Sequence, residues 1–304
     1  MNEPPAQPPV DGLGCRVHLF VAPGGDEIRA LVERHGVGPE IVEHALDPRE
    51  RVRLHEVAGV SLMVLRVPCR TTGTSGPPYR TAPLVVVRTA REVVVISAAE
   101  NDVVAALRVA RDQPPSTSPI GVAVRALEAT ASTYLTYLEE IESATSGIEQ
   151  RLALSLRNEE VLELLQYQKT LVHFTAALRA SFALGERLLA SGARRGDDDE
   201  ERAVLQDAVV ELRQALEVAD LARETLGETM DTFASLISNN LNDVMRVLAA
   251  AAIVLTPPVV IASFWGMNVI IPLRDEPYGF AMLVAASLTV SAVVAGVLRL
   301  RRWM

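Results

Sequence analysis

Small and polar side chains recur at helical spacing along an apolar stretch near the C-terminus. Six of them lie roughly on one side of a helix: Asn242, Met245, Ala249, Ala252, Thr256 and Ser263. Inside a membrane, small residues let helices approach closely, and polar residues face a partner helix or water. The stripe is therefore a candidate lining for a water-filled path. Simple helix packing produces similar stripes and stays open as the alternative.

The stripe belongs to the first of two apolar runs. Residues 247–267 contain no charged side chain, and neither do residues 278–298. Each run is long enough to cross a hydrocarbon core about 30 Å thick, which takes about 20 helical residues. Two such runs separated by a short turn favour a membrane protein over a soluble protein with buried helices.

A possible ion site lies where the first run ends, at Gly266, Met267 and Asn268. Two spans cannot enclose a water-filled path, so conduction would require several copies around one axis, and each lining side chain would become a ring. Asn268 would then form a ring of amide oxygens at the outer end of the first span. Uncharged hard oxygens suit a cation that keeps its water shell, as Mg²⁺ tends to. Pro257 and Pro258 would free backbone carbonyls, which is tolerated beside a cavity.

The chain before the spans predicts a cytosolic α+β domain followed by long helices. Short strand-like runs rich in β-branched residues alternate with helix-like runs, and the pattern after about residue 118 is helical. The fold expected is an α+β cytosolic domain, a long helical stalk and two C-terminal transmembrane helices. The expected segments are a flexible N-terminus at 1–14, the α/β domain at 15–117, a helical hairpin at 118–196, a stalk continuing into the first span at 197–267, an outward-facing loop at 268–279, the second span at 280–298 and a basic tail at 299–304.

The flanks of the spans predict the orientation. The polar, Pro-rich start lacks the features of a signal peptide, so the N-terminal part is expected in the cytosol. Arg299, Arg301 and Arg302 follow the second span, and basic flanks favour the cytoplasmic side. The prediction is a multi-pass protein of the cytoplasmic membrane with both termini inside.

Other chemistries find little support in the sequence. A net charge of −9 without a basic stripe argues against nucleic-acid binding. The five histidines include no pair at helical ligand spacing and are interpreted as structural or surface residues, and Cys15 and Cys69 are interpreted as buried thiols. Neither a Gly-rich phosphate loop nor a nucleophile elbow occurs. We expect no enzyme activity and no cofactor.

The signature Gly266-Met267-Asn268, the preceding "NDVMRVLAAAAIVLTPP" and the N-terminal "HALDPRERVRLHEVAGVSLMVLRVP" and "TAPLVVV" resemble the CorA family of divalent-cation channels. The resemblance implies a funnel-shaped homopentamer with Asn268 as the outer selectivity ring. It also implies a Mg²⁺ pore lined by Asn242, Met245, Leu248 and Thr256, in which Met245 and Leu248 form an apolar constriction that can gate by dewetting.

The resemblance further implies Mg²⁺ sensing by acidic residues at cytosolic subunit interfaces. Asp207 and Glu211 are candidates, against the alternative of a solvated helix face. Many members carry an acidic residue just after the signature, whereas an apolar run at 269–271 follows here. Asp275 and Glu276 are therefore the candidate mouth residues.

Several functional alternatives stay open at this point. Co²⁺ or Ni²⁺ could pass as well as Mg²⁺. A ZntB-like Zn²⁺ transporter is a second candidate, although Met267 and the oxygen-rich stripe favour Mg²⁺. A poorly conducting, membrane-anchored regulatory homologue is the third.

Overall fold

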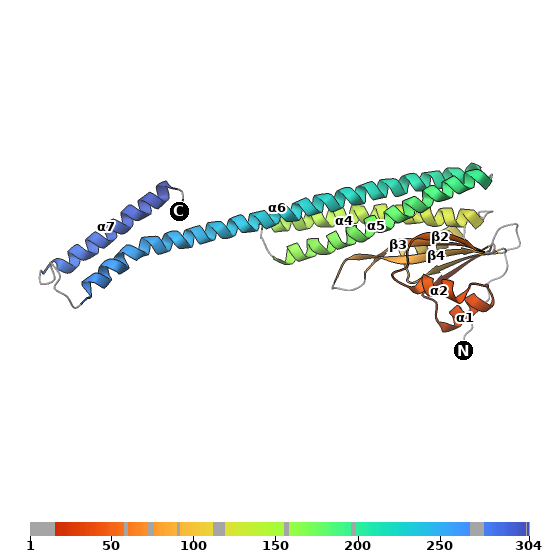
Figure 1. The fold of residues 1–304 in the computed structure, drawn as a ribbon, viewed down its shortest axis with the longest axis horizontal. Coiled ribbons are helices and arrows are strands. Elements are labelled where there is room, and N and C mark those ends of the chain that lie inside the picture. Colours follow the sequence, from red (N-terminus) through yellow and green to blue (C-terminus); the bar gives the residue numbers. More distant parts are fainter. Residues whose placement is uncertain are drawn as a thin grey trace. The chain divides into compact units, whose positions relative to one another are not determined.

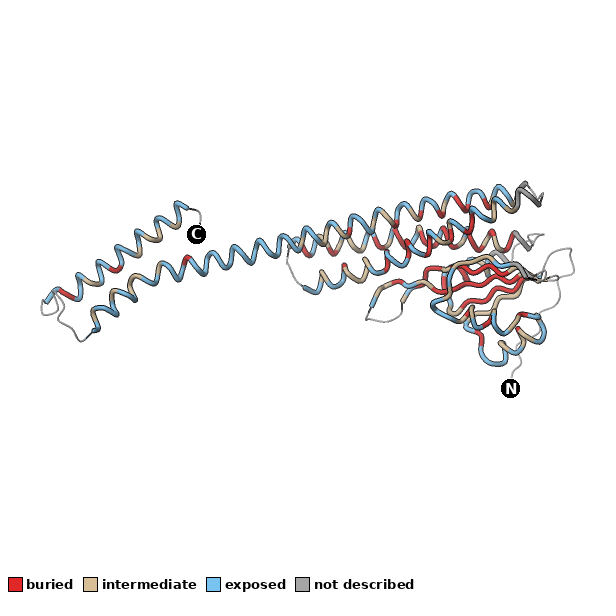
Figure 2. The backbone as a smooth tube through the Cα atoms, in the orientation of Figure 1, coloured by how far each residue is buried: buried red, intermediate tan, exposed pale blue. Residues whose placement is uncertain are grey.

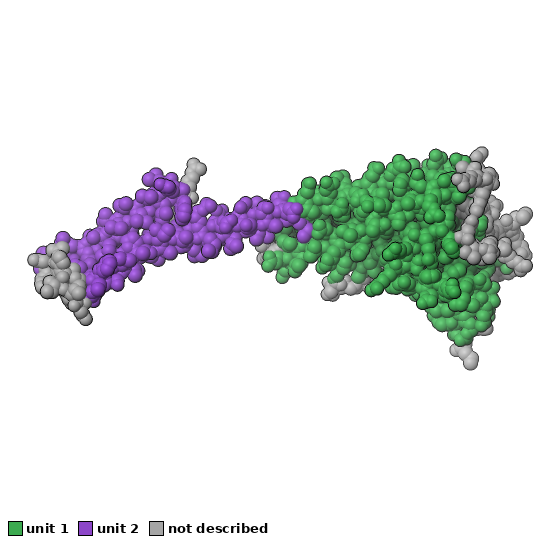
Figure 3. Space-filling model, in the orientation of Figure 1, with its two compact units in different colours: residues 1–228 green, residues 229–304 purple. Residues whose placement is uncertain are grey.

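The computed structural model describes residues 16–57, 60–71, 76–89, 92–111, 119–154, 158–195, 199–267, 277–301 and 303. The chain divides into two compact units, residues 1–228 and 229–304 (Figure 3). The boundary between them falls within one continuous helix, α6 (Asp199–Trp265).

The first unit contains a sheet of five strands in the order β1-β5-β4-β3-β2 (Figure 1). The β1–β5 pair is parallel, and the other neighbouring pairs are antiparallel. The run at 84–87 is buried throughout, as expected for strands with both faces covered. The strands are β1 (Arg16–Val21), β2 (Arg53–Val57), β3 (Val60–Arg70), β4 (Tyr79–Arg88) and β5 (Glu92–Ser97).

Helices α1 (Gly25–Glu33) and α2 (Pro39–Leu46) cover one face of this sheet. Leu31 of α1 and Ala45 of α2 are fully buried there, in a core that also holds Val85, Val94 and Ile96. Pro39 stands in the first turn of α2, where its missing N–H costs no helical hydrogen bond. Neither α2 nor β2 is among the elements expected from the sequence, so both are additions from the structure.

Helices α3 (Asp102–Arg111), α4 (Pro119–Leu154) and α5 (Asn158–Arg195) cover the opposite face. The Tyr134 hydroxyl of α4 donates to the Arg66 carbonyl at 2.8 Å, which ties α4 to β3. Asn101 is the N-cap of α3, because its side-chain oxygen accepts the Val104 N–H at 3.0 Å. The two long helices expected from the sequence are thus present as α4 and α5.

The first part of α6 packs against α5 within the same unit. An ion pair joins Arg179 to Asp220 at 3.1 Å, and the guanidinium of Arg213 lies over the Phe182 ring. Gly185 provides a close approach: a Cβ there would lie 2.7 Å from a methyl carbon of the buried Val209.

The second unit consists of the last part of α6 and of α7 (Gly279–Leu300). Both helices contain a stretch long and apolar enough to cross a membrane, and little of either stretch is buried (Figure 2). Large apolar side chains on these helices are therefore exposed, as in helices that meet lipid or other subunits. The α/β domain, the long helix and the two apolar C-terminal helices are confirmed, whereas the exact domain boundaries stay predictions.

Candidate functional site

The predicted pore stripe lies on a side of α6 that its own chain leaves open. Met245 and Leu248 are 59% and 60% exposed, and Asn242, Ala252 and Thr256 are exposed as well. The Thr256 hydroxyl donates to the Ala252 carbonyl at 2.8 Å, so its hydrogen-bond donor is used within the helix and its oxygen can still accept. The stripe thus presents amide and hydroxyl oxygens among small and apolar side chains.

The opposite side of α6 is covered by α7. Ala250 is fully buried, and the other shielded positions continue the same face at steps of three or four: Val254, Pro257, Pro258, Ile261 and Trp265. At about 100° per residue, the centre of this face lies about 180° from the centre of the predicted pore stripe. Within one chain, α7 therefore covers one side of α6, and the opposite side stays exposed and free for contacts with other subunits.

The face that α7 contributes combines small residues with branched apolar ones. Gly279 and Ser287 are buried, and Leu283, Ser291, Val294 and Leu298 continue that face with partial burial. Small residues at such an interface allow close helix approach without a hydrophobic driving force.

A side chain of α7 compensates for one proline of α6. Pro258 has no N–H, so it cannot donate to the carbonyl of Val254 one turn earlier. The Ser291 hydroxyl donates to that Val254 carbonyl at 3.1 Å. A carbonyl that the helix cannot satisfy is thus satisfied by the neighbouring helix, as a hydrocarbon environment requires. The helix continues through both prolines to Trp265.

The end of α6 lies at the predicted signature. Gly266 donates to the Ala262 carbonyl at 3.0 Å, and Met267 donates to the Phe264 carbonyl at 3.3 Å. The φ angle of Gly266 is outside the left-handed region, and a Cβ would meet only ordinary contacts. The glycine therefore ends the helix here without a strained backbone. Asn268, Asp275 and Glu276 lie outside the described residues.

The candidate regulatory acids lie in the first unit, where α6 runs beside α4. Glu211 is partly buried, and one of its carboxylate oxygens has no hydrogen-bond partner among the described residues. Burial raises the pKa of Glu211, and the negative charges of Glu128 and Asp207 raise it further. The charges of Glu128 and Asp207 thus oppose the ionisation of Glu211, the kind of repulsion that a bound cation relieves.

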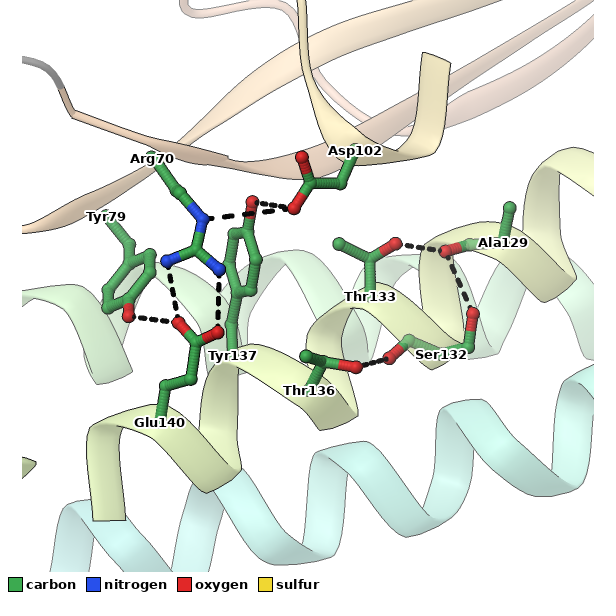
Figure 4. Close-up of polar contacts among 9 residues, drawn as sticks. All are labelled: Arg70, Tyr79, Asp102, Ala129, Ser132, Thr133, Thr136, Tyr137 and Glu140. Atoms are coloured by element: carbon green, nitrogen blue, oxygen red, sulfur yellow. Dashed lines mark hydrogen bonds and ion pairs between the residues drawn. The ribbon is translucent and has the colours of Figure 1, made fainter. Parts of the chain in front are cut away.

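A second charged cluster ties the sheet to the helices (Figure 4). The Arg70 guanidinium donates to both oxygens of Glu140, at 2.8 and 2.6 Å, and lies 4.7 Å from the Tyr137 ring centroid. The Tyr79 hydroxyl also donates to Glu140, and the Tyr137 hydroxyl donates to Asp102. These hydrogen bonds lower the pKa of Glu140. The sequence held no signal for this cluster, because its partners stand far apart along the chain.

Comparison with known proteins identifies the family. The model of the CorA-like Mg²⁺ transporter protein family matches residues 20–302, nearly the whole chain. The chain belongs to this family. It is therefore a membrane protein of a family of divalent-cation transporters, and that family is not one of enzymes. A search of curated proteins gives no match.

Solved structures show that this CorA-family chain has the CorA fold. The complete CorA magnesium transporter from Methanocaldococcus jannaschii matches with a TM-score of 0.80 and 21% identity, over 95% of this chain and 90% of that one. The full-length CmaX protein matches at 0.69 and 18% identity, over 93% and 88%. The cytoplasmic domain of ZntB from Vibrio parahaemolyticus matches at 0.56 and 14% identity, over 74% and 87%.

Proposed function

We propose that this CorA-family chain is a Mg²⁺ channel of the cytoplasmic membrane that also admits Co²⁺ or Ni²⁺. Five copies surround one axis, both termini lie in the cytosol, and Asn268 forms the outer ring that meets the hydrated ion. Asn242, Met245, Leu248, Ala252 and Thr256 line the path, with Met245 and Leu248 at the apolar constriction. Asp275 and Glu276 lie at the outer mouth.

The observation that supports this proposal most is the division of α6 into two faces. The face opposite the pore stripe is used by α7 through Ala250, Val254 and their neighbours. Polar atoms of Asn242 and Thr256 on the uncovered face would be costly in lipid, because each would lose its contact with water. A shared central path would hydrate them in every subunit.

The chemistry of the stripe favours Mg²⁺ over softer ions. Its polar atoms are amide and hydroxyl oxygens, which suit a hard cation that retains its water. Zn²⁺ prefers nitrogen and sulfur ligands, and the stripe offers no histidine or cysteine. Competition of Mg²⁺, Co²⁺ and Zn²⁺ in one uptake assay tests this preference, and Zn²⁺ as the best competitor would favour the ZntB-like alternative.

Cysteine accessibility tests the water-filled path directly. In a chain carrying alanine at Cys15 and Cys69, Ala252→Cys places a thiol on the uncovered face and Ala250→Cys places one under α7. A charged, membrane-impermeant thiosulfonate should modify position 252 in liposomes and reduce ion flux, while position 250 reacts slowly. Faster reaction at position 250 than at 252 would contradict the assigned pore face.

Regulation by cytosolic Mg²⁺ would use Asp207 and Glu211. Burial and, after it, the charges of Glu128 and Asp207 raise the pKa of Glu211, so a bound cation would stabilise its ionised form. Mg²⁺ should raise the thermal midpoint of the wild type and of a Glu217→Gln control, which changes an exposed acid on the same helix. The effect should shrink in Glu211→Gln, and an undiminished effect would remove Glu211 from the proposed site.

A further inference from the structure

Three side chains with metal-binding atoms converge at one edge of the α/β domain, far along the chain from the pore stripe. They are His18 of β1, His35 after α1 and Glu92 at the start of β5. One ligand atom from each lies within 4.8 Å of the other two. None of the three is fully buried, so the cluster can exchange ions with solvent.

The fold explains why these residues meet. β1 and β5 pair in parallel with His18 opposite Val94, and side chains two residues apart on a strand share a face. His18 and Glu92 therefore lie on the sheet face that also carries Val94 and Ile96 and is covered by α1. After α1 the chain doubles back at Gly36, whose φ of +63° favours glycine, and the Val37 N–H returns to the Leu31 carbonyl. This turn holds His35 over the edge of the same face.

The geometry is close to that of a three-ligand metal site. His35 Nδ1 lies 2.9 Å from one oxygen of Glu92, and His18 Nε2 lies 3.1 Å from the other. Ligand atoms around a tetrahedral Zn²⁺ are about 3.3 Å apart, given bond lengths of about 2.0–2.1 Å. Each nitrogen thus lies within a few tenths of an ångström of that spacing from a different oxygen of Glu92, and one atom from each residue lies within 4.8 Å of the other two, so small side-chain rotations would bring the three onto one ion.

We propose that His18, His35 and Glu92 bind a transition-metal cation. Zn²⁺ fits best, and Co²⁺ or Ni²⁺ would bind more weakly. Two imidazole nitrogens and one carboxylate form the donor set of open zinc sites, which keep a fourth position for water. The side chain of His18 is 36% exposed, which leaves room for that water. Mg²⁺ demands oxygen ligands, so this site distinguishes transition metals from the ion proposed for the pore.

Binding would join three segments that are distant in sequence: β1, the end of α1 and the start of β5. A ligand that binds only the folded state stabilises it, so Zn²⁺ should raise the thermal midpoint of this domain. Without metal, His35 and Glu92 share a hydrogen bond, and His18 Nε2 lies 3.1 Å from the other carboxylate oxygen.

The test uses the full-length protein in detergent, freed of metals and kept in excess Mg²⁺ so that oxygen-rich sites are filled. Equilibrium dialysis should show that His35→Gln and Glu92→Gln each lose one bound Zn²⁺ per chain relative to the wild type. His55→Gln, which changes an exposed histidine of β2, should lose none. The Zn²⁺-dependent rise in thermal midpoint should disappear in the same two variants.

A measurement on the wild type guards against variants that fail to fold. X-ray absorption of the Zn²⁺-loaded protein should show the scattering of two imidazoles, and Co²⁺ should give the visible absorption of a four- or five-coordinate ion. Absence of imidazole scattering, or Zn²⁺ stoichiometry unchanged in both variants, would overturn the site and leave a hydrogen-bonded cluster only. Neither readout depends on ion conduction, so the proposal can fail or stand separately from the proposed function.

Discussion

The Ser291–Pro258 relationship predicts a specific thermodynamic coupling inside the second unit. Ser291→Ala removes the hydroxyl that donates to the Val254 carbonyl at 3.1 Å. Pro258 cannot supply a replacement, so the carbonyl loses the donor that stands in for the missing N–H. In Pro258→Ala the missing N–H returns one turn after Val254, and the helix can satisfy the carbonyl by itself.

The expected magnitude follows from the environment of this bond. Hydrogen bonds between membrane helices contribute about 0.6 kcal/mol on average and up to about 1.7 kcal/mol. We expect Ser291→Ala to cost about 1–1.5 kcal/mol, in the upper half of that range, because the carbonyl has no helical alternative. In the Pro258→Ala background the same change should cost under about 0.5 kcal/mol, since both donors compete for one carbonyl. The difference is the coupling energy of the pair.

The assay is reversible unfolding of the four proteins of this double-mutant cycle in mixed micelles titrated with a denaturing detergent. Ser287→Ala is the matched control, because the buried Ser287 hydroxyl donates within its own helix, to the Leu283 carbonyl. That carbonyl retains a helical donor, so the control should stay within about 0.5 kcal/mol of the wild type. Equal costs of Ser291→Ala with and without Pro258 would refute the compensation argument.

Three further predictions concern the first unit. Gly185→Ala should destabilise the protein by about 1–3 kcal/mol, because its Cβ would lie 2.7 Å from Val209. Gly147→Ala, whose Cβ would lie 3.9 Å from its nearest neighbour, should stabilise the protein by up to about 1 kcal/mol. Thermal midpoints of the two variants that move in the same direction would contradict this prediction. Because hydrogen bonds from Arg70 and Tyr79 lower the pKa of Glu140, its contribution is present above the unfolded pKa and is lost as pH falls through the lowered folded value. The stability advantage of the wild type over Glu140→Gln should therefore decline as pH falls below about 4.3, the pKa of an unperturbed glutamate, and an advantage that grows on acidification would have the wrong sign. Burial raises the pKa of the Cys69 thiol to about 11, so it should resist alkylation at pH 8 until the domain unfolds, and rapid labelling of the folded protein would disprove its burial.

The sequence predicted those parts of the fold whose signals are local. Charge-free runs indicated the apolar helices, and β-branched runs indicated β3, β4 and β5, because a strand buried on both faces must be apolar throughout. Asn101 stands directly before an apolar helical pattern, where a capping side chain is expected, and it caps α3. Strand β2, "RLHEV", was missed because its mixed polarity resembles a loop.

Contacts between distant residues could not be predicted in the same way. Arg70 and Glu140 stand 70 residues apart, and His18 and Glu92 are joined only by the parallel pairing of β1 with β5. Spacing along the chain carries no information about such pairs until the strand order is known. The histidines carry no such signal, because ligand spacing along a sequence is recognisable within a single helix, whereas these ligands come from two strands and a turn.

The pore assignment combined both kinds of information. Helical periodicity alone placed Asn242, Ala252 and Thr256 on one side of α6, and the structure shows that α7 covers the other side. Leu248 entered only through the family resemblance, because its apolar side chain does not stand out in an apolar run.

Mg²⁺ flux into proteoliposomes, compared between the wild type and Asn268→Ala, tests the central claim most directly. Both proteins should be reconstituted at equal density and shown to have the same oligomeric state. The proposal predicts Mg²⁺-dependent flux in the wild type and a severe loss in the variant, because the ring of amide oxygens that meets the hydrated ion is gone. Undiminished flux through Asn268→Ala would contradict the assignment of this residue as the filter.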